Sequence, residues 1–279
     1  MILSLLASLA AIALGPAVQQ IADSRTALVT VTDQRTRFIV DLGPDDFVIT
    51  ERGQPREILD ARMADYPIVV LIDTGAAAAQ SFDDMRKAVG KFIARLGPRP
   101  IALGTLGDPP AIVATLDDDR KVLSERLDAL TVKPGADTVT MQAAADAART
   151  LRSLGSRFSA LVVVSGSPID TSRLTPDELI PPIVDSGAVV HAVISRASPD
   201  ASITGLTDVL QRLANQTHGQ FTTIYSAASY QVALDRLADR LASEMVIEYI
   251  VPPRSRATDI QVGVRIPGAR AHGLGVRPQ

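Results

Sequence analysis

The chain has 279 residues, of which 46% are hydrophobic but only 4% aromatic, and its formal net charge is -3. This charge gives no electrostatic case for binding nucleic acid, which needs a concentrated basic face. The absence of cysteine excludes disulfides, thiol catalysis and zinc–thiolate sites. Because aromatic residues are so few, the core must be built from aliphatic side chains, as it usually is in buried parallel sheets.

The chain begins with an apolar block, Ile2–Leu14, followed by the small residues Gly15 to Ala17. The block is shorter than the roughly 20 residues that span a bilayer, but it matches the core of a signal peptide. We predict that residues 1–17 are a signal peptide, although no lysine or arginine precedes the block; a packed N-terminal helix is the alternative. The mature chain would then have no transmembrane segment and be exported to the periplasm, the cell envelope or the medium.

Residues 24–63 are rich in strand patterns. The alternating run "ALVTVTD" predicts one strand, "RFIV" before the Gly43-Pro44 turn a second, and "FVIT" a third, followed by a turn at Arg52-Gly53. Because no polar linker separates this β preamble from Pro67, we expect it to pack against the part that follows.

Residues 66–244 alternate between apolar strands and amphipathic helices. The predicted strands lie in "IVVLID", "IALGTLGDPPAIVATL", "RFSALVVVSGS", "GAVVHAVIS" and "QFTTIY". The predicted helices cover about 81–96, 118–130, 140–154, a segment opened by "TPDEL", 205–219 and 229–245. We expect capping boxes or caps at Ser81 with Asp84 and at Thr175.

The tail, residues 245–279, returns to strand patterns in "MVIEYIVPP" and "DIQVGVRIPG". We expect it to join the preamble or the edge of the sheet. Strands that alternate with helices imply right-handed crossovers. The predicted fold class is therefore α/β, with a doubly wound, mainly parallel sheet flanked by helices and a small β module made from the preamble and the tail.

The strand 68–72 ends at Asp73, after which only small residues and Thr74 occur before Gln80. An acid at the carboxyl end of such a strand often marks a ligand site. It can instead accept hydrogen bonds from backbone N–H groups of the loop that follows, as in an Asx-turn or a cap. Composition alone leaves both roles open.

Four stretches in this order resemble a von Willebrand factor A domain, and more closely the bacterial exported VWFA-related proteins. They are "VTVTDQRTRFIVDLGPDDFVITERGQPREI", "PIVVLIDT", "LQRLANQTHGQFTTIYSAASYQVALDRLADRL" and "MVIEYIVPP". Many such domains hold Mg²⁺ or Mn²⁺ in a metal-ion-dependent adhesion site. Its ligands are a D-x-S-x-S loop, a threonine in a second loop and an aspartate in a third, oxygen ligands that suit a hard cation.

The resemblance places the first acid at Asp73 and the threonine at Thr138, with Asp137 as the alternative after a one-residue shift. The two serine positions fall on Gly75 and Ala77, and the third-loop acid falls on Gly166. We therefore predict a degenerate, vestigial metal site and no cofactor. Binding of Mg²⁺ or Mn²⁺ through substitute ligands remains an alternative; the candidate substitutes are Thr74, Asp137, Ser165, Ser167 and Asp170.

Other chemistry has weaker signals. His191 lies inside a predicted strand, where a packed or hydrogen-bonded role is usual; His218 and His272 lack metal-ligand spacing. Ser165 and Ser167 follow a strand but lack G-x-S-x-G, and the chain has no P-loop or G-x-G-x-x-G for a nucleotide.

The leading hypothesis is a non-catalytic, exported protein-interaction or adhesion domain with an unknown protein partner. The alternatives are a metal-dependent adhesion domain, a serine hydrolase that uses Ser165 or Ser167, and a structural module of an envelope assembly. The predicted partner-binding face consists of Asp73, Thr74, Gly75, Ala76, Ala77, Asp137, Thr138, Ser165, Gly166 and Ser167.

Overall fold

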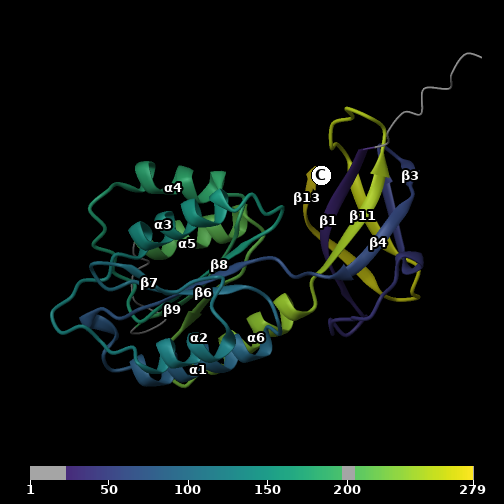
Figure 1. The fold of residues 1–279 in the computed structure, drawn as a ribbon. Coiled ribbons are helices and arrows are strands. Elements are labelled where there is room, and N and C mark those ends of the chain that lie inside the picture. Colours follow the sequence, from purple (N-terminus) through teal and green to yellow (C-terminus); the bar gives the residue numbers. More distant parts are fainter. Residues whose placement is uncertain (1–22, 197–204, 279) are drawn as a thin grey trace, which may run out of the picture.

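The structure is a computed structural model, and it describes residues 23–196 and 205–278. A helix-flanked sheet lies beside a β module (Figure 1). The signal peptide predicted at residues 1–17 lies outside the described residues. Within the described ranges, no helix combines the length and the apolar character needed to cross a membrane.

The larger part is built on a six-stranded sheet with the order β10-β9-β8-β5-β6-β7. Its strands are β5 (Ile68–Ile72), β6 (Ile101–Thr105), β7 (Ala111–Ala114), β8 (Ala160–Ser165), β9 (Val189–Ser195) and β10 (Phe221–Ile224). All neighbours are parallel except β7, which runs antiparallel to β6. Every side chain of β5 is buried because helices cover both faces of the sheet.

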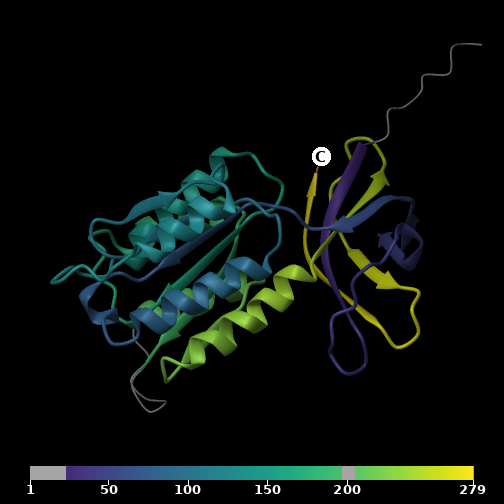
Figure 2. The same ribbon diagram turned by 60° about the horizontal axis from the view of Figure 1, so that its bottom comes forward.

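One face of the sheet is covered by α1 (Phe82–Arg95), α2 (Arg120–Asp128) and α6 (Ser229–Ala242), and the other by α3 (Thr140–Ser153), α4 (Pro176–Asp185) and α5 (Gly205–Gln216) (Figures 1 and 2). Alternate β5 side chains enter different cores. Val70 packs on the side of α1 and α6, and Val69 on the side of α3 and α5. The doubly wound, mainly parallel sheet predicted from the sequence is confirmed.

The helix starts test two predicted caps. Thr175 precedes α4 as predicted. The N–H and the hydroxyl of Thr175 both donate hydrogen bonds to the Glu178 carboxylate, each at 2.9 Å. The capping box predicted for Ser81 and Asp84 is wrong, because Ser81 is itself in a helical conformation and its side chain makes no cap hydrogen bond. The Ser81 hydroxyl instead lies 3.4 Å from the carbonyl of Ala78.

Strands from both ends of the chain form the β module. They are β1 (Asp23–Thr32), β2 (Phe47–Glu51), β3 (Gln54–Arg56), β4 (Ile58–Met63), β11 (Met245–Val251), β12 (Ile260–Val264) and β13 (Arg270–Pro278). They make two sheets, β13-β1-β11-β4 and β12-β2-β3, with a shared apolar core. The tail therefore joins the preamble, as the sequence predicts.

Two details of the β module differ from the predictions. The strand predicted in "RFIV" is reduced to an isolated bridge between Thr32 and Phe38, and the chain turns away at Asp41, whose φ is 62°. The strand β13 is missing from the predictions. Its glycine-containing sequence has little strand character of its own, and it forms by antiparallel pairing with β1.

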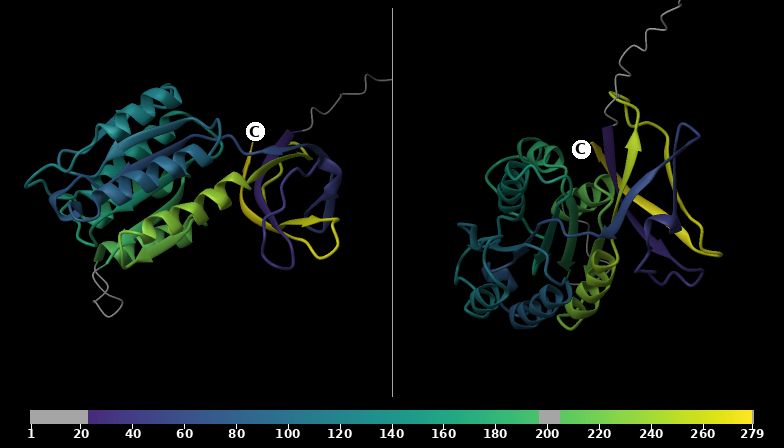
Figure 3. Two further views of the ribbon diagram at one scale, coloured as in Figure 1. Left: turned by 90° about the horizontal axis from the view of Figure 1, so that it is seen from below. Right: turned by 45° about the vertical axis from the view of Figure 1, so that its right-hand side comes forward.

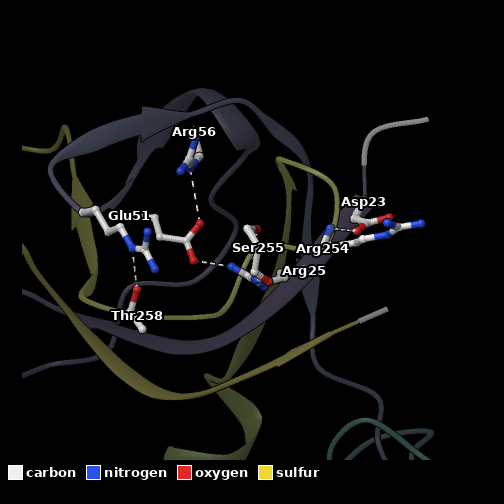
Figure 4. A network of polar contacts seen from close by, with 8 residues as sticks. Asp23, Arg25, Glu51, Arg56, Arg254, Ser255 and Thr258 are labelled. Carbon is white, nitrogen blue, oxygen red and sulfur yellow. Dashed lines mark hydrogen bonds and ion pairs between the residues drawn. The ribbon is translucent and has the colours of Figure 1, made fainter. Parts of the chain in front are cut away.

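An ion pair is buried inside the β module (Figure 4). Arg25 on β1 pairs with Glu51 on β2, and the two residues are 4% and 1% exposed. Arg56 Nε lies 3.4 Å from the other Glu51 oxygen. Arg25 also donates to the carbonyl of Ser255 in the loop between β11 and β12, so the ion pair ties this loop to β1.

The β module and the helix-flanked sheet are in contact, and a few apolar side chains of the β module extend the core on one face of the sheet. Two chain segments connect them, one between β4 and β5 and one at the end of α6, which runs toward the β module (Figure 3). The segments are joined by a hydrogen bond from Ala64 N–H to the Glu244 carbonyl at 2.8 Å. Leu28 and Val246 of the β module belong to the same apolar cluster as Phe158. The expectation that the preamble packs against the following part is confirmed.

Candidate binding crevice at the carboxyl edge of the sheet

The candidate site, which we call the crevice, consists of three loops: the first follows β5 (73–81), the second precedes α3 (129–139) and the third follows β8 (166–175). It lies where the chain changes direction within the sheet. From β5 the chain first moves to β6 and β7, and it later returns to the other side of β5 as β8. At such a switch point, the loops that leave the two central strands diverge and open a crevice. Asp73 directly follows β5, and Gly166 directly follows β8.

Asp73 is fully buried, and its two carboxylate oxygens accept four hydrogen bonds. Oδ1 accepts from the Gly75 N–H at 2.9 Å and from the Thr138 hydroxyl at 3.0 Å. Oδ2 accepts from the Gly166 N–H and the Ser165 hydroxyl, both at 3.0 Å. The carboxylate thus joins all three loops of the crevice, and donors within the protein satisfy both of its oxygens.

Two glycines allow the loops to approach Asp73 this closely. A Cβ added at Gly75 would lie 2.2 Å from the Thr138 hydroxyl oxygen, and one added at Gly166 would lie 2.6 Å from Ala78 Cβ. The φ of Gly75 is -69°, which any residue adopts. The limit at position 75 is therefore space, since Thr138 occupies the volume that a side chain would need.

Backbone hydrogen bonds join the first loop to the second. The Ala76 N–H donates to the Ala136 carbonyl, and the Lys133 N–H donates to the Thr74 carbonyl, both at 2.9 Å. Residues Ala76–Ala78 form a single 3-10 turn in which Ala78 is buried, while Ala76 and Ala77 are exposed. The first loop therefore presents small, uncharged side chains to solvent.

The two candidate serines of the third loop are engaged within the protein. The Ser165 hydroxyl is fully buried and lies 2.8 Å from the Ser167 carbonyl as well as close to Asp73. The Ser167 hydroxyl accepts from the Ile169 N–H at 3.1 Å. Within the described residues, no imidazole hydrogen-bonds to either hydroxyl, so the pairing with a base that a serine nucleophile needs is not present there.

Of the remaining candidate substitute ligands, only Asp170 has a side chain that is hydrogen-bonded to other groups of the described residues. Asp170 Oδ1 lies 3.4 Å from the Met141 N–H at the start of α3, and burial raises the pKa of this carboxyl. Asp137 is exposed on the second loop, and the buried Thr74 hydroxyl has no hydrogen-bond partner among the described residues. No group of three or more histidine, cysteine, aspartate or glutamate side chains within 23–196 and 205–278 could hold a metal ion together.

His191 is packed and hydrogen-bonded, as its strand position predicts. It is fully buried on β9, and its Nδ1 accepts from the Gln220 N–H at 3.0 Å. Burial, together with the nearby Arg240, lowers the pKa of His191 to about 3. The imidazole is therefore neutral in the folded protein near pH 7.

Sequence patterns did not single out Tyr230, Ile169 or Leu174. Tyr230, in the first turn of α6, donates to the Ser165 carbonyl at 2.8 Å, and burial raises its pKa to about 12. Ile169 and Leu174 are 60% and 41% exposed. A tyrosine in an amphipathic helix is expected to be a core residue, and a single apolar residue in a loop belongs to no periodic pattern. The sequence therefore contains no signal for these three residues.

No profile of a known protein family matches the chain, and no curated protein sequence matches it. Solved structures do match. A von Willebrand factor type A protein from Catenulispora acidiphila has a TM-score of 0.55 and 12% identity, with 93% of this chain and 74% of that one covered.

The proximal thread matrix protein 1 of the mussel byssus has a TM-score of 0.52 and 11% identity. The match covers 65% of this chain and 49% of the mussel protein, so the chain corresponds to about half of that protein. Likeness at this level of identity establishes the fold. The chain has the fold of a von Willebrand factor type A domain.

Proposed function

We propose that this chain is an exported, non-catalytic domain that binds another protein through the carboxyl edge of its six-stranded sheet, without a divalent cation. The observation that carries the proposal is the closed arrangement around Asp73. Its carboxylate accepts four hydrogen bonds from the protein, and the Thr138 hydroxyl fills the space above Gly75.

The oxygen atoms around Asp73 do not fit the needs of Mg²⁺ or Mn²⁺. A small hard cation needs about six oxygen ligands in near-octahedral geometry, and several of them are usually waters that require room. Here one carboxylate and two hydroxyls hydrogen-bond to one another, while positions 75, 77 and 166 bear no oxygen-containing side chain. Asp170, the nearest substitute acid in the third loop, is engaged at the start of α3.

Exposed apolar side chains support a protein-binding role for this edge. Ile169 and Leu174 lie in the loop that follows β8, and Tyr225, which follows β10, is 47% exposed. Apolar groups that gather on one edge of a soluble domain are typical of protein interaction sites. Export is proposed from the N-terminal apolar block alone.

The test is capture of a partner from the cell envelope by the immobilised full chain. Ala77 is exposed, so Ala77→Arg is expected to leave the fold intact and to lower recovery of the partner at least tenfold, because it places a bulky charge at the crevice mouth. Leu154→Ser, an exposed position at the C-terminal end of α3 and therefore at the opposite, amino edge of the sheet, is the control.

Metal dependence is measured in the same capture with and without chelator, and by calorimetry with Mg²⁺ and Mn²⁺. We expect recovery to be unaffected by the chelator and no heat of metal binding. Recovery that depends on metal would favour the metal-dependent adhesion domain instead. Equal recovery by wild type and Ala77→Arg would overturn the proposed face, and labelling of the chain by a fluorophosphonate would revive the serine hydrolase.

A further inference from the structure

A pocket opens beside the crevice, between the loop that follows β8 and the start of α5. Its volume is about 380 Å³, within the range of roughly 300–1,000 Å³ that is usual for binding pockets. Its walls include Ile169 and Leu174, and its floor is formed by Met141, Leu206 and Val209. The pocket therefore lies at the same edge of the sheet as Asp73.

The pocket is mostly apolar and is open to solvent. Ile169 has the largest exposed fraction, 60%, among the large apolar side chains of the described residues, and Leu174 is 41% exposed, while the three floor residues are at most 6% exposed. Exposed apolar walls above a buried apolar floor favour an occupant that removes them from water. A single aliphatic or aromatic side chain of a partner would do so.

Hydrogen bonds hold the wall of the pocket in place. Thr171 N–H donates to the Thr138 carbonyl at 3.0 Å, and the Ser172 hydroxyl accepts from the Gln142 N–H at the same distance. The wall then continues into the capped start of α4. A partner would thus meet a preformed pocket and would lose little free energy in ordering it.

The rim of the pocket is acidic. Asp170 lies in its wall, and Asp177 and Glu178 lie in the first turn of α4. No lysine or arginine forms a salt bridge with these three acids among the described residues. Arg212 on α5 pairs with Asp208 at 2.7 Å, and the exposed Arg173, in the loop that forms the wall, lies 3.8 Å from Asp108. Complementarity therefore favours a cationic partner segment.

We infer that this pocket receives an apolar side chain from a protein segment that carries lysine or arginine next to it. The inference rests on the proposed binding edge and names the chemistry of its partner. The apolar side chain fills the pocket, and the neighbouring cations lie over Asp170, Asp177 and Glu178.

The experiment titrates the full chain with three fluorescein-labelled peptides of equal length, which alternate lysine with leucine, glutamate with leucine, or lysine with serine. The lysine–leucine peptide is expected to bind at least tenfold more tightly than either of the others, as measured by fluorescence anisotropy. The double variant Ile169→Ser/Leu174→Ser should weaken its binding at least tenfold, and Asp177→Asn about threefold. Ile169, Leu174 and Asp177 are all exposed, so the variants are expected to keep the fold, which circular dichroism checks.

Leu154→Ser is the matched control, because it removes a similarly exposed apolar side chain from the C-terminal end of α3, which lies at the opposite, amino edge of the sheet. Equal binding of the three peptides, or equal weakening by the control, would overturn the inference. So would a dimer in sedimentation that Ile169→Ser dissociates, since the occupant would then be a second copy of the chain. If Ala77→Arg abolishes partner capture while the pocket variants change nothing, the binding edge stands and the pocket assignment fails; if neither matters, both fail.

Discussion

At the scale of single residues, the role of Asp73 depends on the atoms around its carboxylate. Four donors surround it, and two of them are backbone N–H groups that approach closely because positions 75 and 166 are glycine. We propose that the same acid in the same fold would need more room and more oxygen atoms around it to hold a cation. The neighbours of Asp73, rather than Asp73 itself, therefore set the chemistry of this site.

Adding one methyl group at Gly75 tests this closed arrangement. Gly75→Ala would place its Cβ in the volume of the Thr138 hydroxyl, and we expect a loss of about 1–3 kcal/mol in the free energy of unfolding. Denaturant unfolding measures the change. The loss should be smaller in a Thr138→Ala background, where the clashing oxygen is gone.

The control for this prediction is Ala77→Ser, at an exposed position of the same loop, which should change the free energy of unfolding by no more than about 0.5 kcal/mol. An equal cost of Gly75→Ala with and without the Thr138 hydroxyl would contradict the explanation by space.

His191 makes stability depend on pH. Its pKa is about 3 in the folded protein and about 6.5 in the unfolded chain, so between these values only the unfolded chain binds the proton. Stability from this group is complete above pH 6.5 and falls by about 1.4 kcal/mol for each pH unit below it. Unfolding free energies at pH 6.5 and 4.5 should therefore differ by about 2–3 kcal/mol more in wild type than in His191→Asn.

Asparagine is the suitable replacement because its carbonyl oxygen can still accept the Gln220 N–H and it does not titrate. The variant is expected to be less stable at neutral pH, since it is smaller and leaves a cavity. The test is therefore the slope of the unfolding free energy against pH, not its value at one pH. Parallel curves for the two proteins would show that His191 does not titrate on unfolding.

At the scale of secondary-structure elements, the start of α3 depends on a loop that is distant in the sequence. Val139, the N-cap residue that precedes this helix, offers no side-chain cap. Asp170 and Ser172, from the loop that follows β8, instead accept from N–H groups of the first turn. This contact fixes the second and third loops of the crevice to each other. Capping across loops thus builds the wall of the proposed pocket.

Removing this cap is expected to loosen the start of α3. Ser172→Ala takes away the acceptor of the Gln142 N–H and should cost about 1 kcal/mol of unfolding free energy, the usual value of a helix cap. Hydrogen exchange should become faster at the first turn of α3 and remain unchanged in α6. Ser153→Ala, at the exposed end of the same helix, is the control, and equal effects of the two substitutions would contradict the capping role.

At the scale of the whole molecule, one buried polar contact stabilises the β module and another lies at its junction with the helix-flanked sheet. Within the β module, the buried pair of Arg25 and Glu51 ties the β11–β12 loop to the interior (Figure 4). At the junction, the Tyr66 hydroxyl donates to the Glu244 carboxylate, and the Arg99 guanidinium lies 4.8 Å from the centre of the Tyr66 ring. Burial raises the pKa of Glu244, because its charged form has lost most of its water.

Tyr66→Phe should therefore destabilise the whole chain. It deprives a buried carboxylate of a donor, and we expect a loss of about 1–3 kcal/mol in the free energy of unfolding. Tyr225→Phe removes a hydroxyl from a half-exposed ring and is the control. Because side chains of both parts pack in one apolar cluster at the junction, unfolding should remain one cooperative transition. A Tyr66→Phe variant as stable as Tyr225→Phe would count against this role of Tyr66.

The sequence by itself determined the order of the elements and the parallel sheet, and it limited the tail to the preamble or the edge of the sheet. Runs such as "IVVLI" are apolar throughout, and that pattern has few solutions other than a strand covered on both faces. The strand pattern also located Asp73 at the carboxyl end of β5, while the resemblance to von Willebrand factor A domains indicated Thr138 and the positions without ligand oxygens.

Only the tertiary structure decided how these residues interact. The four hydrogen bonds to Asp73 join residues up to 93 positions apart, and the strand β13 exists because β1 pairs with it. The exposure of Ile169 and the role of Asp170 at α3 likewise arise from contacts between distant segments. Local patterns record the period of a helix or strand, whereas distances between loops are set by the packing of the whole sheet.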